Sequence, residues 1–183
     1  MDSKPDKWQR LDRKNLLDTR FMKVYQDTVK LPTGAIINDY TVATLPSGVV
    51  VVATDTEGRL LTQFEYKYAI DRVILNLPSG SIENDRSPLE VAAMELLEET
   101  GYESKEFELI QTTYEYPSKL DHRLHIVRAK NAVKVKSVQH EVTESIGEVH
   151  LITSDMADFG GVFDATYTIA ALALTLPEFL KTR

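Results

Sequence analysis

Three glutamates, Glu95, Glu98 and Glu99, stand three and four residues apart near the middle of the 183-residue chain. On a helix these spacings make the carboxylates neighbours that repel one another weakly. Hard cations such as Mg²⁺ or Mn²⁺ prefer carboxylate oxygens, completed by phosphate and water. A bound cation would therefore turn the repulsion into attraction. The alternative is an acidic helix face that is simply solvated.

The flanking residues predict a helix over residues 88–100. Ser87 suits the N-cap, Pro88 suits the first helical position, and Glu90 completes a capping box with Ser87. Gly101 is a good C-terminal stop. At about 100° per residue, one side of this helix carries Leu89, Ala93, Leu96, Leu97 and Thr100. The acidic side carries Val91, Glu95, Glu98 and Glu99.

The rest of the chain supplies strands and one more helix. Residues 1–20 are polar and are predicted to form a loose arm, and Asp164 is the expected cap of a last helix over residues 165–176. Apolar alternation or apolar runs predict strands at residues 21–31, 35–45, 49–53, 60–68, 107–116, 124–129 and 148–153, and residues 73–77 lead into the glycine loop. This order is α+β. We expect an arm and β-hairpin over residues 1–45 and a main domain over residues 46–183.

Composition narrows the class of protein. The formal net charge of −7 argues against general binding to nucleic acid or to an anionic membrane. No apolar run is long enough to span a bilayer, and no signal-peptide pattern begins the chain. The sequence has no cysteine, which excludes disulfides and thiolate chemistry. These features favour a cytoplasmic location.

The segment 80–102 resembles the Nudix box, whose pattern is Gly, five residues, Glu, seven residues, then Arg-Glu-apolar-any-Glu-Glu-any-Gly-apolar. The matching residues are Gly80, Glu95, Leu96, Glu98, Glu99, Gly101 and Tyr102. Arg86 stands where the family has its first Glu, and Met94 stands where it has Arg. The resemblance implies the Nudix fold, a mixed β-sheet sandwiched between helices, here with an N-terminal β-hairpin extension.

Further segments resemble the ADP-ribose pyrophosphatase branch of that family. They are the N-terminal hairpin, the segment 66–72, Pro117, which stands fifteen residues after the box, and the last-helix segment 164–172. Two stretches depart from the branch. Asn76 replaces its Glu before Leu-Pro, and Phe64-Glu65 replaces its Arg-Gln.

The resemblance implies roles for individual residues. Glu95, Glu98 and Glu99, with the carbonyl of Ser79, would bind Mg²⁺ or Mn²⁺. A late-loop glutamate would orient or deprotonate the attacking water, and Glu144 is preferred to Glu141 for this role. The catalytic residues are thus predicted to be Glu98 and Glu144.

Substrate contacts are predicted at Tyr66, Lys67, Arg72 and Ser118. Arg suits a bidentate grip on phosphate, whereas Lys offers a point charge. Arg72 could instead pair with a structural carboxylate. Tyr66 or Phe64 could stack on a nucleobase, although aromatic residues in strands more often belong to the core.

The predicted function is metal-dependent hydrolysis of ADP-ribose, or of a related nucleoside diphosphate sugar, to a nucleoside monophosphate and a sugar phosphate. The resemblance also implies a homodimer. One alternative is a Nudix-fold nucleotide-binding or regulatory module with weak or no hydrolysis, because of the changes at Arg86, Met94, Asn76 and Glu65. Another alternative is a Nudix enzyme for a dinucleoside polyphosphate or a capped or oxidised nucleotide.

Overall fold

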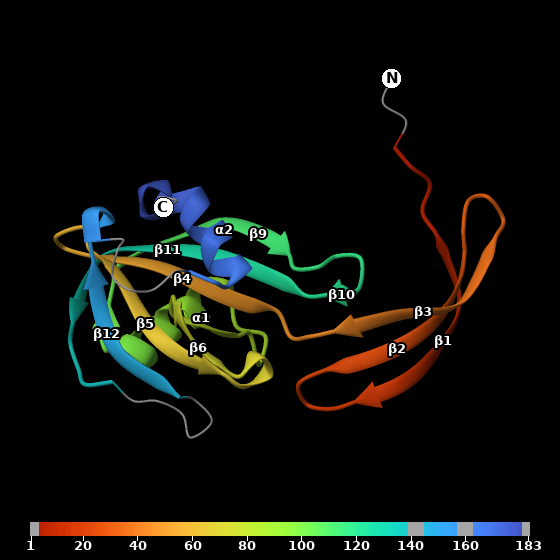
Figure 1. The fold of residues 1–183 in the computed structure, drawn as a ribbon, viewed down its shortest axis with the longest axis horizontal. Coiled ribbons are helices and arrows are strands. Elements are labelled where there is room, and N and C mark those ends of the chain that lie inside the picture. The colour runs from red at the N-terminus through yellow and green to blue at the C-terminus, as the bar shows by residue number, and fades with distance from the viewer. Residues whose placement is uncertain (1–3, 139–144, 157–162, 181–183) are drawn as a thin grey trace. The chain divides into compact units, whose positions relative to one another are not determined.

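The computed structural model describes residues 4–138, 145–156 and 163–180 (Figure 1). Contacts divide these residues into two compact units. Unit 1 takes its residues from Met1–Pro46 and Tyr114–His122, and unit 2 takes its residues from Ser47–Thr113 and Arg123–Arg183.

Unit 1 is a four-stranded sheet in the order β1-β2-β3-β10. Its strands are β1 (Gln9–Asp18), β2 (Lys23–Lys30), β3 (Ile36–Thr44) and the short β10 (Leu120–Asp121). The first three are antiparallel, and β10 lies parallel to β3. The predicted hairpin is confirmed, but the predicted loose arm is wrong because β1 is a ten-residue strand. Every side chain of β1 is exposed, so its sequence lacks the alternation that marks a half-buried strand.

An ion pair joins β1 to β2. Arg13 donates from Nε and Nη2 to the two carboxylate oxygens of Asp27, both at 2.7 Å. Its guanidinium also lies 4.3 Å from the centre of the Tyr25 ring. The Asp27 side chain is buried, and the Arg13 hydrogen bonds lower its pKa although burial opposes this. The pair therefore anchors a strand that has no buried apolar side chain of its own.

Unit 2 is built on a mixed sheet with the central order β12-β5-β4-β11-β8. Strand β4 is parallel to β11 and antiparallel to β5 and β7. Strands β6 and β9 pair with β5 and β11. The strand bounds are β4 (Gly48–Asp55), β5 (Leu60–Lys67), β6 (Arg72–Asn76), β7 (Ser79–Ser81), β8 (Tyr102–Glu103), β9 (Glu106–Tyr114), β11 (Arg123–Lys134) and β12 (Ile146–Ile152).

Two helices cover the two faces of β4 and β11 (Figure 1). Val49 and Val51 pack with the face that meets α1 (Pro88–Glu95), whereas Val50 and Val52 pack with the face that meets α2 (Thr166–Thr175). Burial on both faces explains the continuous apolar run of β4. The predicted α+β class and the sheet between helices are confirmed.

Short helical turns complete the fold: η1 (Tyr68–Ile70), η3 (Ser154–Met156), η4 (Pro177–Leu180), and the π-helical turn η2 (Leu96–Thr100) that continues α1. The capping box of α1 is present as predicted, and Gly101 ends the turn with a φ of 74°. The predicted Asp164 cap is wrong. The N-cap of α2 is Ala165, while Asp164 accepts a hydrogen bond from Arg72 instead. No helix in the described ranges has the length and apolar character needed to cross a membrane.

Removing the β1 anchor tests its contribution. We expect Arg13→Ala to lower the free energy of unfolding of unit 1 by about 2 kcal/mol, because the buried Asp27 carboxylate loses its partner. Amide hydrogen exchange should accelerate along β1. The control Lys14→Ala, also on β1 and exposed, should change neither quantity. Unchanged exchange in Arg13→Ala would show that the backbone ladder alone holds β1.

Candidate active site

The acidic side of the first helix faces the protein interior. Glu95 is 9% exposed and Glu99 is 3% exposed, whereas Leu89 is 38% exposed. The predicted division into faces is therefore wrong: the buried side combines Val91, Ala92, Glu95, Leu96, Glu99 and Thr100. The solvated alternative is contradicted for Glu95 and Glu99, while Glu98 is half-buried.

Close approach between α1 and β7 positions Glu95. A Cβ atom placed on Gly80 would lie 2.0 Å from Glu95 Oε1 and 2.9 Å from its Cγ. Only glycine leaves room for the carboxylate there. The π-helical turn then carries the chain from Glu95 to Glu99, and such turns are frequent at functional sites.

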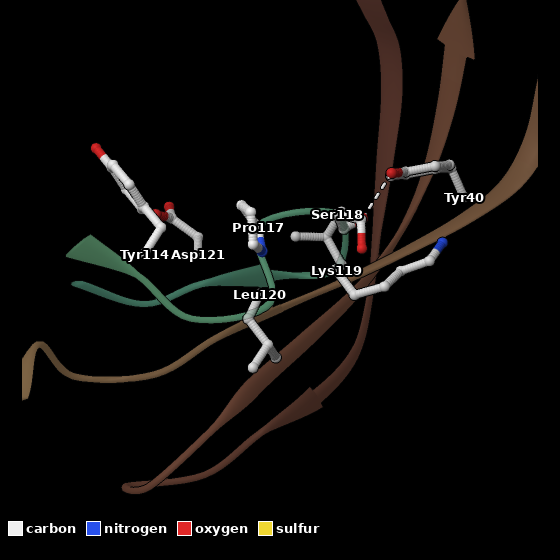
Figure 2. Close-up of a pocket in the computed structure, with 8 residues that line it drawn as sticks. Tyr40, Tyr114, Pro117, Ser118, Lys119, Leu120 and Asp121 are labelled. Atoms are coloured by element: carbon white, nitrogen blue, oxygen red, sulfur yellow. Dashed lines mark hydrogen bonds between the residues drawn. The ribbon is translucent and has the colours of Figure 1, made fainter. Parts of the chain in front are cut away.

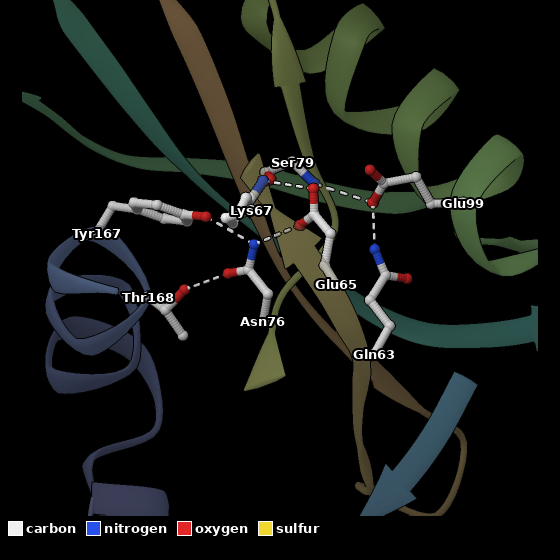
Figure 3. A network of polar contacts seen from close by, with 8 residues as sticks. All are labelled: Gln63, Glu65, Lys67, Asn76, Ser79, Glu99, Tyr167 and Thr168. Carbon is white, nitrogen blue, oxygen red and sulfur yellow. Dashed lines mark hydrogen bonds and ion pairs between the residues drawn. The ribbon is translucent and has the colours of Figure 1, made fainter. Parts of the chain in front are cut away.

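The Glu99 carboxylate is held from two strands (Figure 3). Its Oε2 accepts hydrogen bonds from Gln63 Nε2 on β5 at 2.8 Å and from the Ser79 backbone N–H on β7 at 3.1 Å. Burial, and after it the charge of Glu95, raise the pKa of Glu99 well above its ordinary value, although these two hydrogen bonds lower it. A positive charge beside the carboxylates of Glu95 and Glu99 is therefore favoured.

A polar network continues from this point toward α2 (Figure 3). Lys67 forms an ion pair with Glu65, whose second oxygen accepts a 2.8 Å hydrogen bond from Asn76 Nδ2. Asn76 also bonds the hydroxyls of Tyr167 and Thr168, each at 2.6 Å. Burial works against the charge of Lys67, yet Tyr167 and Glu65 outweigh it and raise its pKa, so Lys67 is a cation at neutral pH.

The other predicted contact residues of unit 2 have partners nearby. The Tyr66 hydroxyl donates to Asp71 at 2.9 Å, and Arg72 Nη2 lies 3.3 Å from Asp164. The alternative for Arg72, a pairing with a carboxylate, is thus observed. Arg72 is nevertheless exposed, with 65% of its side-chain surface accessible. Phe64 packs edge-on against His150.

Ser118 lies in unit 1, beside a cavity of about 370 Å³ (Figure 2). Its carbonyl accepts a 2.7 Å hydrogen bond from the Tyr40 hydroxyl. Lys119 Nζ lies 3.9 Å from the centre of the Tyr40 ring. Pro117 also lines this cavity, which combines aromatic and apolar surface with the charged residues Lys119 and Asp121.

The carboxylate donors fit a hard divalent cation, but their side chains do not converge on one point. Within residues 4–138, 145–156 and 163–180, no three His, Cys, Asp or Glu side chains converge as metal ligands. The fit rests on carboxylate chemistry and on the raised pKa of Glu99 beside Glu95. Glu144 and Glu141 lie outside the described residues.

Sequence reasoning did not identify Gln63, Tyr167 and Thr168 as parts of this network. A usable signal exists on β5, where Gln63, Glu65 and Lys67 recur at every second position and therefore share one face of the strand. The two hydroxyls gave no signal, because their contact with Asn76 joins residues more than ninety positions apart.

Comparison with models of known protein families identifies the family of the chain. Residues 44–167 match the model of the NUDIX domain, and residues 8–43 match the model of the nucleoside diphosphate sugar hydrolase N-terminal domain. The chain belongs to the Nudix family. The predicted resemblance is confirmed, and with it the class of Nudix pyrophosphatases.

Related proteins cover most of this Nudix chain. It is 25% identical to an ADP-ribose pyrophosphatase of Bacillus subtilis (strain 168), over 92% of this chain and 93% of that protein. It is 26% identical to a methanol dehydrogenase activator of Bacillus methanolicus, over 88% and 89%. The crystal structure of an ADP compounds hydrolase covers 94% of both chains with a TM-score of 0.78 at 19% identity, which shows the Nudix fold.

The two substituted Nudix box positions contact each other in the structure. Arg86 Nη1 lies 2.8 Å from Met94 Sδ. Arg86 is exposed just before α1, whereas Met94 directly precedes Glu95 on α1 and packs, partly buried, against the core on that face of the sheet. The chain therefore retains the buried carboxylates of the box although Arg86 and Met94 replace the family's Glu and Arg.

The raised pKa of Glu99 predicts that the metal-free protein loses stability as the pH rises. Because the folded-state pKa lies above the unfolded one, stability is lost as pH rises through the folded-state value. In EDTA at pH 7.5 we expect the free energy of unfolding of Glu99→Gln to be about 1 kcal/mol higher than that of the wild type, because the amide oxygen still accepts both hydrogen bonds. The difference should vanish near pH 4.

Thermal and urea unfolding at several pH values would measure this effect. Glu98→Gln, a neighbouring half-buried glutamate, serves as the matched control and should change stability by less than about 0.5 kcal/mol. A Glu99→Gln protein that is less stable than the wild type at pH 7.5 would contradict the assignment of a buried, repelled carboxylate.

Proposed function

We propose that this Nudix protein hydrolyses the pyrophosphate bond of ADP-ribose or a related nucleoside diphosphate sugar in the presence of Mg²⁺ or Mn²⁺. One observation carries the proposal: Glu95 and Glu99 are buried together against β7, with the Lys67 cation in the adjoining network. The match of residues 8–43 to the nucleoside diphosphate sugar hydrolase N-terminal domain and the ADP-ribose pyrophosphatase relative support this substrate class.

The cation would be held by carboxylate oxygens of Glu95, Glu98 and Glu99 and by the carbonyl of Ser79. When bound, a divalent cation neutralises phosphate charge and acidifies water. The protein contributes a fixed donor face, because β7, α1 and the π-helical turn hold these groups on regular elements.

Other side chains would bind the substrate. Lys67 and Arg72 offer positive charge to the two phosphates, and Tyr66 and Ser118 stay candidates for contacts to the nucleoside or sugar. Glu144 stays the candidate that orients the attacking water. The homodimer stays a prediction from the family resemblance.

The reaction needs no redox partner. The oxygen of water forms a bond to one phosphorus atom, and the bond from that phosphorus to the bridging oxygen breaks. The bridging oxygen leaves with the other phosphate, and the proton of the water passes to a general base. The products are a nucleoside monophosphate and a sugar phosphate.

A second candidate function is a nucleotide-binding module with little turnover. The contact between Arg86 and Met94 favours it, because a thioether and a guanidinium replace the ionic pair of the family's box. The acidic residues of the box are unchanged, so binding of a metal and a nucleotide would survive in such a module.

A substrate panel separates the two candidates. We expect wild-type protein with Mg²⁺ or Mn²⁺ to release phosphatase-sensitive product from ADP-ribose or another nucleoside diphosphate sugar. ADP-glucose, GDP-mannose and a diadenosine polyphosphate complete the panel. Glu95→Gln and Glu99→Gln should each lower kcat/KM by about 10²-fold or more, because charge stabilisation at the phosphates is lost. A folded protein that is stabilised by these ligands but hydrolyses none of them would establish the binding module.

The fit between Gly80 and Glu95 gives an independent test. In Gly80→Ala the new methyl group would occupy the position of Glu95 Oε1, and the flexible carboxylate end would move. We expect the free energy of unfolding to fall by less than about 1 kcal/mol. The Mg²⁺ concentration for half-maximal activity should rise about tenfold.

Gly147→Ala is the matched control for that experiment. A Cβ atom there would lie 3.4 Å from its nearest neighbour, the carbonyl oxygen of Phe64, and would not touch the acidic residues. Equal metal dependence in Gly80→Ala and the wild type would remove Glu95 from the proposed metal ligands.

A further inference from the structure

Asn76 uses every hydrogen-bonding group of its side chain. It is fully buried, and its Nδ2 donates to Glu65 Oε2 at 2.8 Å and contacts the Tyr167 hydroxyl oxygen at 2.6 Å. Its Oδ1 accepts from the Thr168 hydroxyl at 2.6 Å. An asparagine amide has two N–H donors and one carbonyl acceptor. The three contacts therefore define one orientation of the amide.

Glu65 connects this amide to a cation. The residue is only 9% exposed, and its two oxygens divide between Asn76 Nδ2 and the Lys67 ammonium. A buried carboxylate is stable when it is paired and hydrogen-bonded. A continuous series of contacts thus connects helix α2, through Asn76 and Glu65, to the end of β5 (Figure 3).

Lys67 is the member of this series that reaches solvent, with 35% of its side-chain surface exposed, against 12% for Glu65 and a fully buried Asn76. It also lies near enough to the Glu99 carboxylate for that charge to favour its protonated form. A long lysine side chain otherwise samples many rotamers, and fixing it costs conformational entropy. Pairing with Glu65 limits this freedom before any ligand arrives.

We propose that Asn76 and Glu65 are positioning residues that hold the Lys67 ammonium for contact with the phosphates of the substrate. This inference rests on the proposed function. Neither residue touches the substrate: Asn76 orients Glu65, and Glu65 orients Lys67.

The chemistry of the pair explains why an amide stands at position 76. A carboxylate there would face the Glu65 carboxylate across 2.8 Å in a buried site, and the two charges would repel. In the family pattern that these segments resemble, Gln and Glu stand at the two positions, which is the same pair with the amide and the carboxylate exchanged between β5 and β6. The exchange keeps one negative charge and one N–H donor in the contact.

A swap of the two residues tests the inference. Asn76→Asp should weaken binding of inorganic pyrophosphate with Mg²⁺ about tenfold by calorimetry, because the displaced carboxylates draw Lys67 away from the phosphates. KM for the hydrolysed sugar nucleotide should rise more than kcat falls. The double variant Glu65→Gln/Asn76→Asp restores one carboxylate and one amide, and we expect its affinity to return to within about threefold of the wild type.

Lys67→Met separates positioning from a structural role. It should weaken pyrophosphate binding about tenfold by itself, and Asn76→Asp added to it should cause no further loss. Further loss in the Lys67→Met background, failure of the swap to rescue, or unchanged affinity in Asn76→Asp would each overturn the inference. Wild-type protein that does not bind pyrophosphate would overturn it as well.

The outcomes distinguish this inference from the proposed function. Rescue by the swap in a protein that hydrolyses no nucleoside diphosphate sugar would refute the proposed function and support the positioning role. Turnover of ADP-ribose with no effect of Asn76→Asp would support the proposed function and refute the positioning role. Unfolding midpoints of all variants, which should agree between the double variant and the wild type, exclude misfolding as the cause.

Discussion

The buried carboxylate of Glu99 is the constraint on which the site of unit 2 depends. Its neighbours give it two hydrogen bonds, from Gln63 and from the backbone of Ser79, and place the charge of Glu95 nearby. Two hydrogen bonds do not offset burial and like charge together, so the pKa of Glu99 stays raised. Keeping such a group lowers the stability of the fold, a trade-off that is typical of residues retained for activity.

The sheet provides the rigidity that this arrangement requires. Strand β4 is covered on both faces, which fixes the strands β5 and β7 that pair with it. From β5, alternate side chains carry Gln63, Glu65 and Lys67 to one face, and β7 offers backbone groups and the glycine that admits Glu95. The polar groups thus project from strands rather than from loops, so their separations are set by the backbone.

The family, the α+β class and most strands could be predicted because they rest on local patterns. The capping box, Gly101 and the apolar run of β4 each have a local physical cause. The buried face of α1 could not be predicted, because the π-helical turn changes the angular spacing and because Gly80 makes room for a carboxylate in the interior. Strand β1 was missed since pairing with β2, and not burial of its side chains, makes it a strand.

Burial decides which departures from the family pattern carry information about the site. Arg86 contacts Met94 but is itself exposed, so an unpaired guanidinium there would be solvated at little cost. Glu65 and Asn76 are buried, where one unpaired charge costs several kcal/mol. A single substitution at either buried residue would therefore leave the other without its hydrogen-bonded partner. Glu65 and Asn76 belong to the network that includes Lys67, whereas the contact between Arg86 and Met94 lies outside that network.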